Sequence, residues 1–65
     1  HTPVRVEEWG AGLPPPRAAV LQGGGHYTAV VMIGGGEWWH CDDEKVARVA
    51  NAERMIRERG YIVFF

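Results

Sequence analysis

The stretch His26–Ile33 (HYTAVVMI), with the glycines 34–36 and Glu37–Cys41 (EWWHC) after it, decides the fold of this chain. β-Branched and aromatic residues dominate both segments, which is typical of buried strands. A short glycine connection supplies the positive φ values that a tight turn between antiparallel strands requires. The stretch therefore predicts a β-hairpin in which the start of the first strand lies beside the end of the second.

Three flanking segments extend this hairpin into a sheet. The alternation of apolar and charged residues in 1–9 predicts a short strand that ends at Trp9. The apolar run 18–21 predicts a second strand, which stops at Gln22 and the glycines 23–25. Residues 61–65 (YIVFF) predict a buried strand that closes the chain.

Residues 43–59 carry apolar side chains at roughly helical spacing, and Gly60 is a natural stop. Asn51 favours an N-cap over a helix interior. We therefore expect the helix at Ala52–Arg59, capped by Asn51, with a turn or short strand before it. Together these elements predict an α+β fold, an antiparallel β-sheet with one short helix.

The chain divides by composition into two parts. Residues 1–16 predict an N-terminal strand and a proline-rich spacer, because Pro14–Pro16 lack the N–H donors that a sheet interior needs. Three prolines favour polyproline II, which acts as a stiff spacer or as a ligand for an aromatic groove of the SH3 type. Residues 17–65 form the second part, which carries the candidate site.

Composition excludes several classes of function. The net charge is −1, with acids and bases interspersed, so we expect no nucleic-acid partner. The longest apolar run, Thr28–Ile33, is too short to span a bilayer, so we expect no membrane partner. A single cysteine cannot form an internal disulfide and suits a reducing compartment, which indicates a cytoplasmic or nuclear protein.

Neither a metal nor another cofactor is expected. His40, Cys41 and Asp42 are sequence neighbours, and adjacent strand residues point to opposite faces, so the three cannot converge on one ion. The other histidines, His1 and His26, share no metal-ligand spacing with Cys41.

The predicted hairpin brings two chemically matched residues together. His26 begins one strand and Asp42 follows the other, and residues on paired strands lie within about 5 Å across the ladder. A carboxylate beside an imidazole fixes its tautomer and stabilises the imidazolium, which is the base-and-orienter half of a catalytic triad. The same pair is equally an ordinary hydrogen bond at the ends of two strands.

Three motifs favour the catalytic interpretation. GGGHYTAVVM, GEWWHCDDEKV and GYIVFF, in this order and spacing, resemble the C-terminal box of the ubiquitin-specific protease family of cysteine deubiquitinases. The resemblance runs from about Ala18 to Phe65. It implies that this chain is part of a papain-like cysteine protease fold and of a thiol protease that hydrolyses peptide or isopeptide bonds at the C-terminal glycine of ubiquitin.

The resemblance also implies a role for individual residues. His26 would be the catalytic general base, Asp42 the orienting acid and Asp43 a secondary acid near the site. Gly24 and Gly25 would line the channel for the C-terminal tail of ubiquitin or of a ubiquitin-like protein, where a β-carbon would crowd the substrate backbone.

The aromatic residues of the same motifs have a less specific role. Tyr27 would contact substrate or, like Trp38, pack beneath the site.

The nucleophile is expected outside this chain. If Asp42 faces His26, its strand neighbour Cys41 faces the opposite side and behaves as a small hydrophobic residue. In the family that the motifs resemble, the nucleophilic cysteine lies in a separate box far upstream, so the remaining Cys-box lobe would be the partner. The alternatives are a non-catalytic ubiquitin-binding or scaffold module on the same fold, and an unrelated β-rich interaction domain that uses the prolines.

Overall fold

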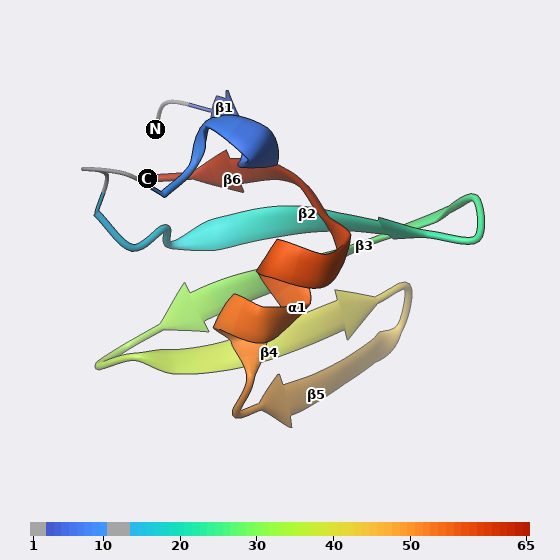
Figure 1. Cartoon of the computed structure of the whole chain (residues 1–65). Helices are drawn as coiled ribbons and strands as arrows, with labels where there is room; N and C mark the ends of the chain where they lie inside the picture. Colours follow the sequence, from blue (N-terminus) through green and yellow to red (C-terminus); the bar gives the residue numbers. More distant parts are fainter. Residues whose placement is uncertain (1–2, 11–13) are drawn as a thin grey trace.

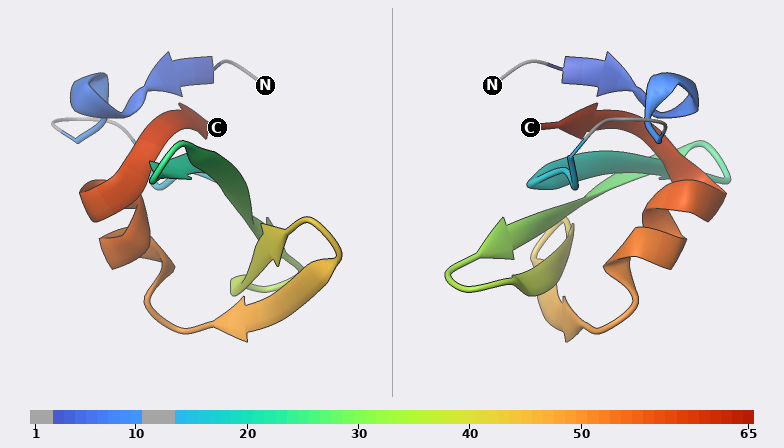
Figure 2. Two further views of the ribbon diagram at one scale, coloured as in Figure 1. Left: turned by 90° about the vertical axis from the view of Figure 1, so that its right-hand side faces the viewer. Right: turned by 60° about the vertical axis from the view of Figure 1, so that its left-hand side comes forward.

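A computed structural model describes residues 3–10 and 14–65. Within these residues, six strands form one antiparallel sheet in the order β1-β6-β2-β3-β4-β5, and one α-helix packs on one face of it (Figures 1 and 2). The predicted α+β class is confirmed. The elements are β1 (Pro3–Arg5), the 3-10 helix η1 (Val6–Glu8), β2 (Ala18–Gly23), β3 (His26–Ile33), β4 (Glu37–Asp42), β5 (Lys45–Val49), α1 (Ala52–Arg59) and β6 (Gly60–Phe64).

Strands β2 to β5 form a meander, in which each strand pairs with the next along the chain. The predicted strands on either side of the glycines 34–36 are confirmed as β3 and β4, and the apolar run 18–21 lies within β2. After β5, helix α1 crosses back over the sheet, so that β6 pairs with β2 on one side and with β1 on the other. The end of the chain is thereby placed inside the sheet (Figure 1).

The core lies between α1 and one face of the sheet. Its members are at most 1% exposed, and strand pairing aligns Ala19 with both Val30 and Val63 on that face. Ile56 of α1 packs against them, and the half-buried Trp38 packs at the border. The fully buried cluster consists of Ala19, Leu21, Val30, Ile56 and Val63.

The helix has the predicted bounds, and Asn51 occupies the predicted N-cap position, but its side chain does not cap the helix. Asn51 has φ −116° and ψ 41°, and its side chain makes no capping hydrogen bond. Instead, the Asn51 carbonyl accepts a hydrogen bond from the Met55 N–H at 3.1 Å. Packing of Ala52 and Ile56 into the core stabilises the helix without a hydrogen bond from the Asn51 side chain.

The N-terminal segment differs from its prediction. The strand ends at Arg5, and η1 folds the chain back, so that the Trp9 N–H donates to the Val6 carbonyl at 3.0 Å. This turn places Val4, Val6 and Trp9 against the core, with the Arg57 guanidinium 4.5 Å above the Trp9 ring. Burial of these apolar side chains outweighs the local alternation that predicts a longer strand.

Further predictions concern the N-terminal strand and the proline-rich spacer. The predicted spacer residues 14–16 lie outside the strands, with Pro16 buried. Residues 1–2 of the predicted strand, including the His1 considered as a metal ligand, and residues 11–13 of the predicted spacer lie outside the described residues.

The last strand, β6, was expected to be buried throughout, but only Val63 is buried. The face of the sheet away from α1 is open and leaves Tyr61 45% exposed.

Among the described residues there is no helix long and apolar enough to cross a membrane.

Gly60 joins α1 directly to β6 and has no room for a side chain. A β-carbon there would overlap the Ile56 carbonyl and lie 3.0 Å from Val6 Cγ2. Gly60→Ala should therefore lower the free energy of unfolding by about 1–3 kcal/mol, measured by urea denaturation. The matched control is Gly35→Ala, where a β-carbon meets nothing within 4 Å and the change should stay within about 0.5 kcal/mol. Equal effects of the two substitutions would contradict this packing.

Candidate active site

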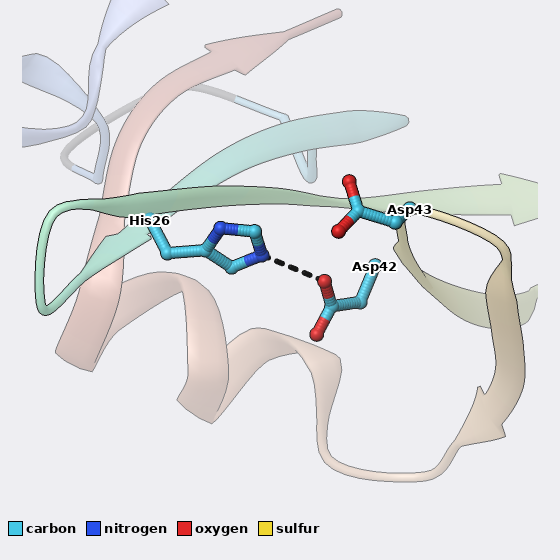
Figure 3. Close-up of side chains that lie close together, drawn as sticks. All are labelled: His26, Asp42 and Asp43. Atoms are coloured by element: carbon cyan, nitrogen blue, oxygen red, sulfur yellow. Dashed lines mark hydrogen bonds and ion pairs between the residues drawn. The ribbon is translucent and has the colours of Figure 1, made fainter.

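The structure brings His26 and Asp42 into direct contact. His26 is the first residue of β3 and Asp42 the last of β4. His26 Nε2 and Asp42 Oδ1 are 2.7 Å apart, and Nε2–H donates because an ionised carboxylate only accepts (Figure 3). The side chains are 52% and 38% exposed, so the pair is open to solvent and to a substrate.

The register of the hairpin explains this contact. In the pairing of β3 with β4, Val30 lies opposite His40 and Ala29 opposite Cys41, where the ladder ends. Alternation places His26 and Asp42 on the same face as Val30, which is the face covered by α1 further along the sheet. The two side chains therefore meet diagonally across strand ends that lie beyond the last ladder pair.

The turn before β3 places His26 at the tip of the β2–β3 hairpin. Gly23 pairs with His26, leaving Gly24 and Gly25 as a two-residue loop with φ values of 59° and 77°. Two consecutive positive φ values are the signature of a type I′ turn and favour glycine at both positions. A β-carbon at either position would meet nothing within 4 Å, so the turn conformation accounts for both glycines in this structure.

Asp43 is the third member of the cluster. It has φ 55°, a left-handed conformation that aspartate tolerates better than most residues and that suits the tight turn from Asp42 to Lys45. Its carboxylate lies on the same side as that of Asp42 (Figure 3). One ligand atom from each of His26, Asp42 and Asp43 lies within 4.8 Å of the other two.

These three donors could hold a divalent cation, a grouping that sequence reasoning missed. In the sequence, metal-ligand spacing was considered between the histidines and Cys41. The cluster instead depends on how the turn between β4 and β5 orients Asp43. The His26 nitrogen is nevertheless already bonded to Asp42, and exposed carboxylates commonly gather without an ion. His26 and Asp42 satisfy each other as a hydrogen-bonded acid–base pair, so we assign no metal to these residues.

The electrostatics of the pair are those of a base and its orienting acid. The hydrogen bond and the charge of Asp42, with a smaller contribution from Asp43, raise the pKa of His26 above its ordinary 6.5 despite some desolvation. The hydrogen bond from His26 lowers the pKa of Asp42 below its ordinary 3.8. The charged pair therefore contributes stability in full between about pH 4 and pH 6.5, and loses it as pH rises through the folded-state pKa of His26 or falls through that of Asp42.

The hydrogen bond also decides which imidazole nitrogen acts as the base. With Nε2–H donating to Asp42, the neutral ring of His26 carries its lone pair on Nδ1. Nδ1 can accept a proton from a nucleophile, and Asp42 stabilises the imidazolium that results.

The other predicted site residues do not join the pair. Tyr27 is 53% exposed on the face opposite His26, where its ring centroid lies 6.1 Å from that of Tyr61, so the expectation that it packs beneath the site is wrong. Strand alternation turns it away from the α1 side. Trp38 does pack against the core. Cys41 is half-buried, and alternation directs it to the same open face as Tyr27.

Sequence reasoning missed a second polar pair next to the first. His40 Nε2 and Thr28 Oγ1 are 2.9 Å apart and partly buried. Each residue lies two positions from a member of the His26–Asp42 pair, toward the middle of the same strand. The i, i+2 spacing along both predicted strands was the available signal.

The raised pKa of His26 leads to a direct prediction. In the folded protein, His26 should titrate above pH 6.5 by NMR. Asp42→Asn should lower that pKa, because an amide oxygen accepts a weaker hydrogen bond from the imidazolium and the carboxylate charge is lost. The matched control is Asp43→Asn, which removes only the weaker charge contribution and should lower the pKa less. A larger effect at Asp43 would show that the assignment of the hydrogen-bonded carboxylate is wrong.

Comparison with known proteins identifies the family of the chain. The model of the family described as ubiquitin carboxyl-terminal hydrolase matches residues 19–65, which include both His26 and Asp42. Searches of curated proteins and of solved structures found no match. Since the matched region makes up more than half of the 65 residues, the chain belongs to the ubiquitin carboxyl-terminal hydrolase family.

Proposed function

We propose that this chain supplies the general base His26 and the orienting acid Asp42 of a thiol protease that hydrolyses bonds at the C-terminal glycine of ubiquitin. The observation that carries the proposal is the 2.7 Å hydrogen bond from His26 Nε2 to Asp42, which makes Nδ1 the basic nitrogen. Membership of the ubiquitin carboxyl-terminal hydrolase family supports the reaction and the substrate.

The reaction follows from the protonation states of the pair. His26 Nδ1 takes the thiol proton of a cysteine on another segment, and the thiolate attacks the carbonyl carbon of the terminal glycine. The imidazolium returns that proton to the leaving amine, which leaves an acyl-enzyme thioester. His26 then takes a proton from water, whose oxygen attacks the thioester carbonyl and breaks the C–S bond. The carboxylic acid is released, and the imidazolium returns its proton to the sulfur to regenerate the thiol. Asp42 stabilises each imidazolium that forms.

A second segment is part of this proposal. It would carry the nucleophile and the oxyanion donors, and with this chain it would form a papain-like fold. The open face of the sheet supports such a partner, because its apolar side chains are 45–60% exposed and soluble proteins rarely leave large apolar patches uncovered. These side chains are Ile33, Val46 and Tyr61.

The substrate tail would pass the tip of the β2–β3 hairpin. Gly24 and Gly25 are exposed beside His26, and the space around them would admit an extended backbone. Tyr27 is exposed next to them on the other face, where it would contact ubiquitin beyond the tail.

The position of Cys41 keeps one alternative open. The only cysteine of this chain points to the opposite face from His26, and among the described residues it is not part of the His26–Asp42 cluster. A family member that lacked a nucleophile on any segment would bind ubiquitin without cleaving it. Formation of a covalent adduct with a ubiquitin C-terminal electrophile would exclude this alternative.

The paired roles of His26 and Asp42 can be tested by kinetics in the protease assembled with its nucleophile segment. His26→Ala should lower kcat/KM on a fluorogenic ubiquitin C-terminal amide by roughly 10³-fold or more, because it removes proton transfer. Asp42→Asn should cost less, since the ring remains. The double variant should be hardly worse than His26→Ala, because both residues act through one imidazole. Additive losses would show that the two residues act independently.

Cys41→Ser provides a separate test of the nucleophile assignment. Because Cys41 faces away from His26, turnover should stay within a few-fold, at a stability cost on the order of 1 kcal/mol for the half-buried thiol. Turnover is measured with the same fluorogenic substrate, and the fold is checked by circular dichroism. Complete loss of turnover in a folded variant would identify Cys41 as the nucleophile.

A further inference from the structure

The strand ends that carry His26 and Asp42 lack direct backbone pairing with each other. The β3–β4 ladder ends at Ala29 opposite Cys41. Beyond it, β3 is held by β2, with Gly23 opposite His26, and β4 is held by β5, where Lys45 lies opposite Asp42. The separation of the two ends therefore depends on side-chain contacts across the gap.

The hydrogen bond between His40 and Thr28 lies at this gap. Thr28 is the first β3 residue beyond the ladder, and His40 belongs to the last ladder pair but one on β4. Their 2.9 Å bond and the 2.7 Å bond of His26 with Asp42 cross the strands with the same diagonal offset, two residues apart along each strand. The inner bond is partly buried and the outer one exposed, so the inner bond is the better shielded of the two.

We propose that His40, held by Thr28, is a positioning residue for the His26–Asp42 pair. Their bond holds the strand ends at the separation at which Nε2 of His26 reaches Asp42. Electrostatic interaction with His40 also contributes, to a lesser extent than the hydrogen bond from His26, to the lowered pKa of Asp42. Neither His40 nor Thr28 touches the reacting atoms. The inference rests on the function proposed above.

Thr28→Val removes the hydroxyl with almost no change of shape, and His40→Phe removes both ring nitrogens. In the assembled protease, each should lower kcat on the fluorogenic ubiquitin amide by about 10- to 100-fold, the range that a small misplacement of a catalytic group causes. KM should stay within a few-fold, because both residues lie away from the hairpin tip, where the substrate tail is proposed to pass. The double variant should have about the same kcat as the less active of the two single variants, since both changes break the same hydrogen bond.

Thr28→Ser and His40→Gln keep a hydrogen-bonding group at each position and should therefore restore most of kcat. If the two side chains only contributed packing to the stability of the fold, kcat would not depend on this hydrogen bond. Glu37→Gln is the matched control. It weakens the 3.6 Å ion pair with Arg48 at the far end of β4 and should leave kcat unchanged. If His40→Phe fails to fold, Thr28→Val decides the question alone.

The outcomes separate this inference from the proposed function. Wild-type kcat in both Thr28→Val and His40→Phe, with His26→Ala inactive, would overturn the positioning role and leave the proposed function standing. Activity in His26→Ala would overturn the proposed function itself. Loss of kcat in Thr28→Val without recovery in Thr28→Ser would also contradict the positioning role, because the hydroxyl would not be the group that matters.

Discussion

The register between β3 and β4 is the constraint on which the candidate site depends. Val30 opposite His40 fixes which side chains share a face, and a slip of one residue would turn every side chain of a strand to the other face. Val30 belongs to the buried core with Leu21 and Ile56, so such a slip would expose the core and bury polar residues. Core packing thus holds His26 and Asp42 on one face, although neither residue is buried.

The site combines a rigid support with an open location. His26 and Asp42 lie where the sheet ends, beyond the last backbone pair and at the exit of a two-residue glycine turn. A general base has to be exposed to reach a substrate, but it loses efficiency if its orientation varies. Here each residue is fixed by a different neighbouring strand, and the side-chain bonds between the two strand ends complete the arrangement.

The remainder of the chain stabilises this support from the other side of the core. Helix α1 covers the sheet through Ala52 and Ile56, and β6 returns to the centre of the sheet between β1 and β2 (Figures 1 and 2). The N-terminal residues 3–9 add a strand and an apolar turn against the same core. The polar cluster therefore lies at the ends of the inner strands β3 and β4, whereas β1 and β6 pair with each other on the far side of β2.

The amino-acid sequence by itself determined the elements with strong local signals. β-Branched residues with glycines 34–36 between them predicted β3 and β4. The N-cap preference of Asn51, together with Gly60 as a stop, predicted the helix bounds. The same register made the meeting of His26 with Asp42 predictable, because a hairpin turn fixes which strand ends lie together.

Only the tertiary structure decided the features that depend on contacts distant in sequence. η1 forms because Trp9 reaches the core beneath Arg57, and α1 is stabilised by its buried face without a capping hydrogen bond from the Asn51 side chain. The inward turn of Asp43 and the bond between Thr28 and His40 likewise depend on how β3, β4 and β5 end relative to one another. Such features are not encoded by periodicity, because each results from packing energy that exists only after the sheet and the helix have assembled.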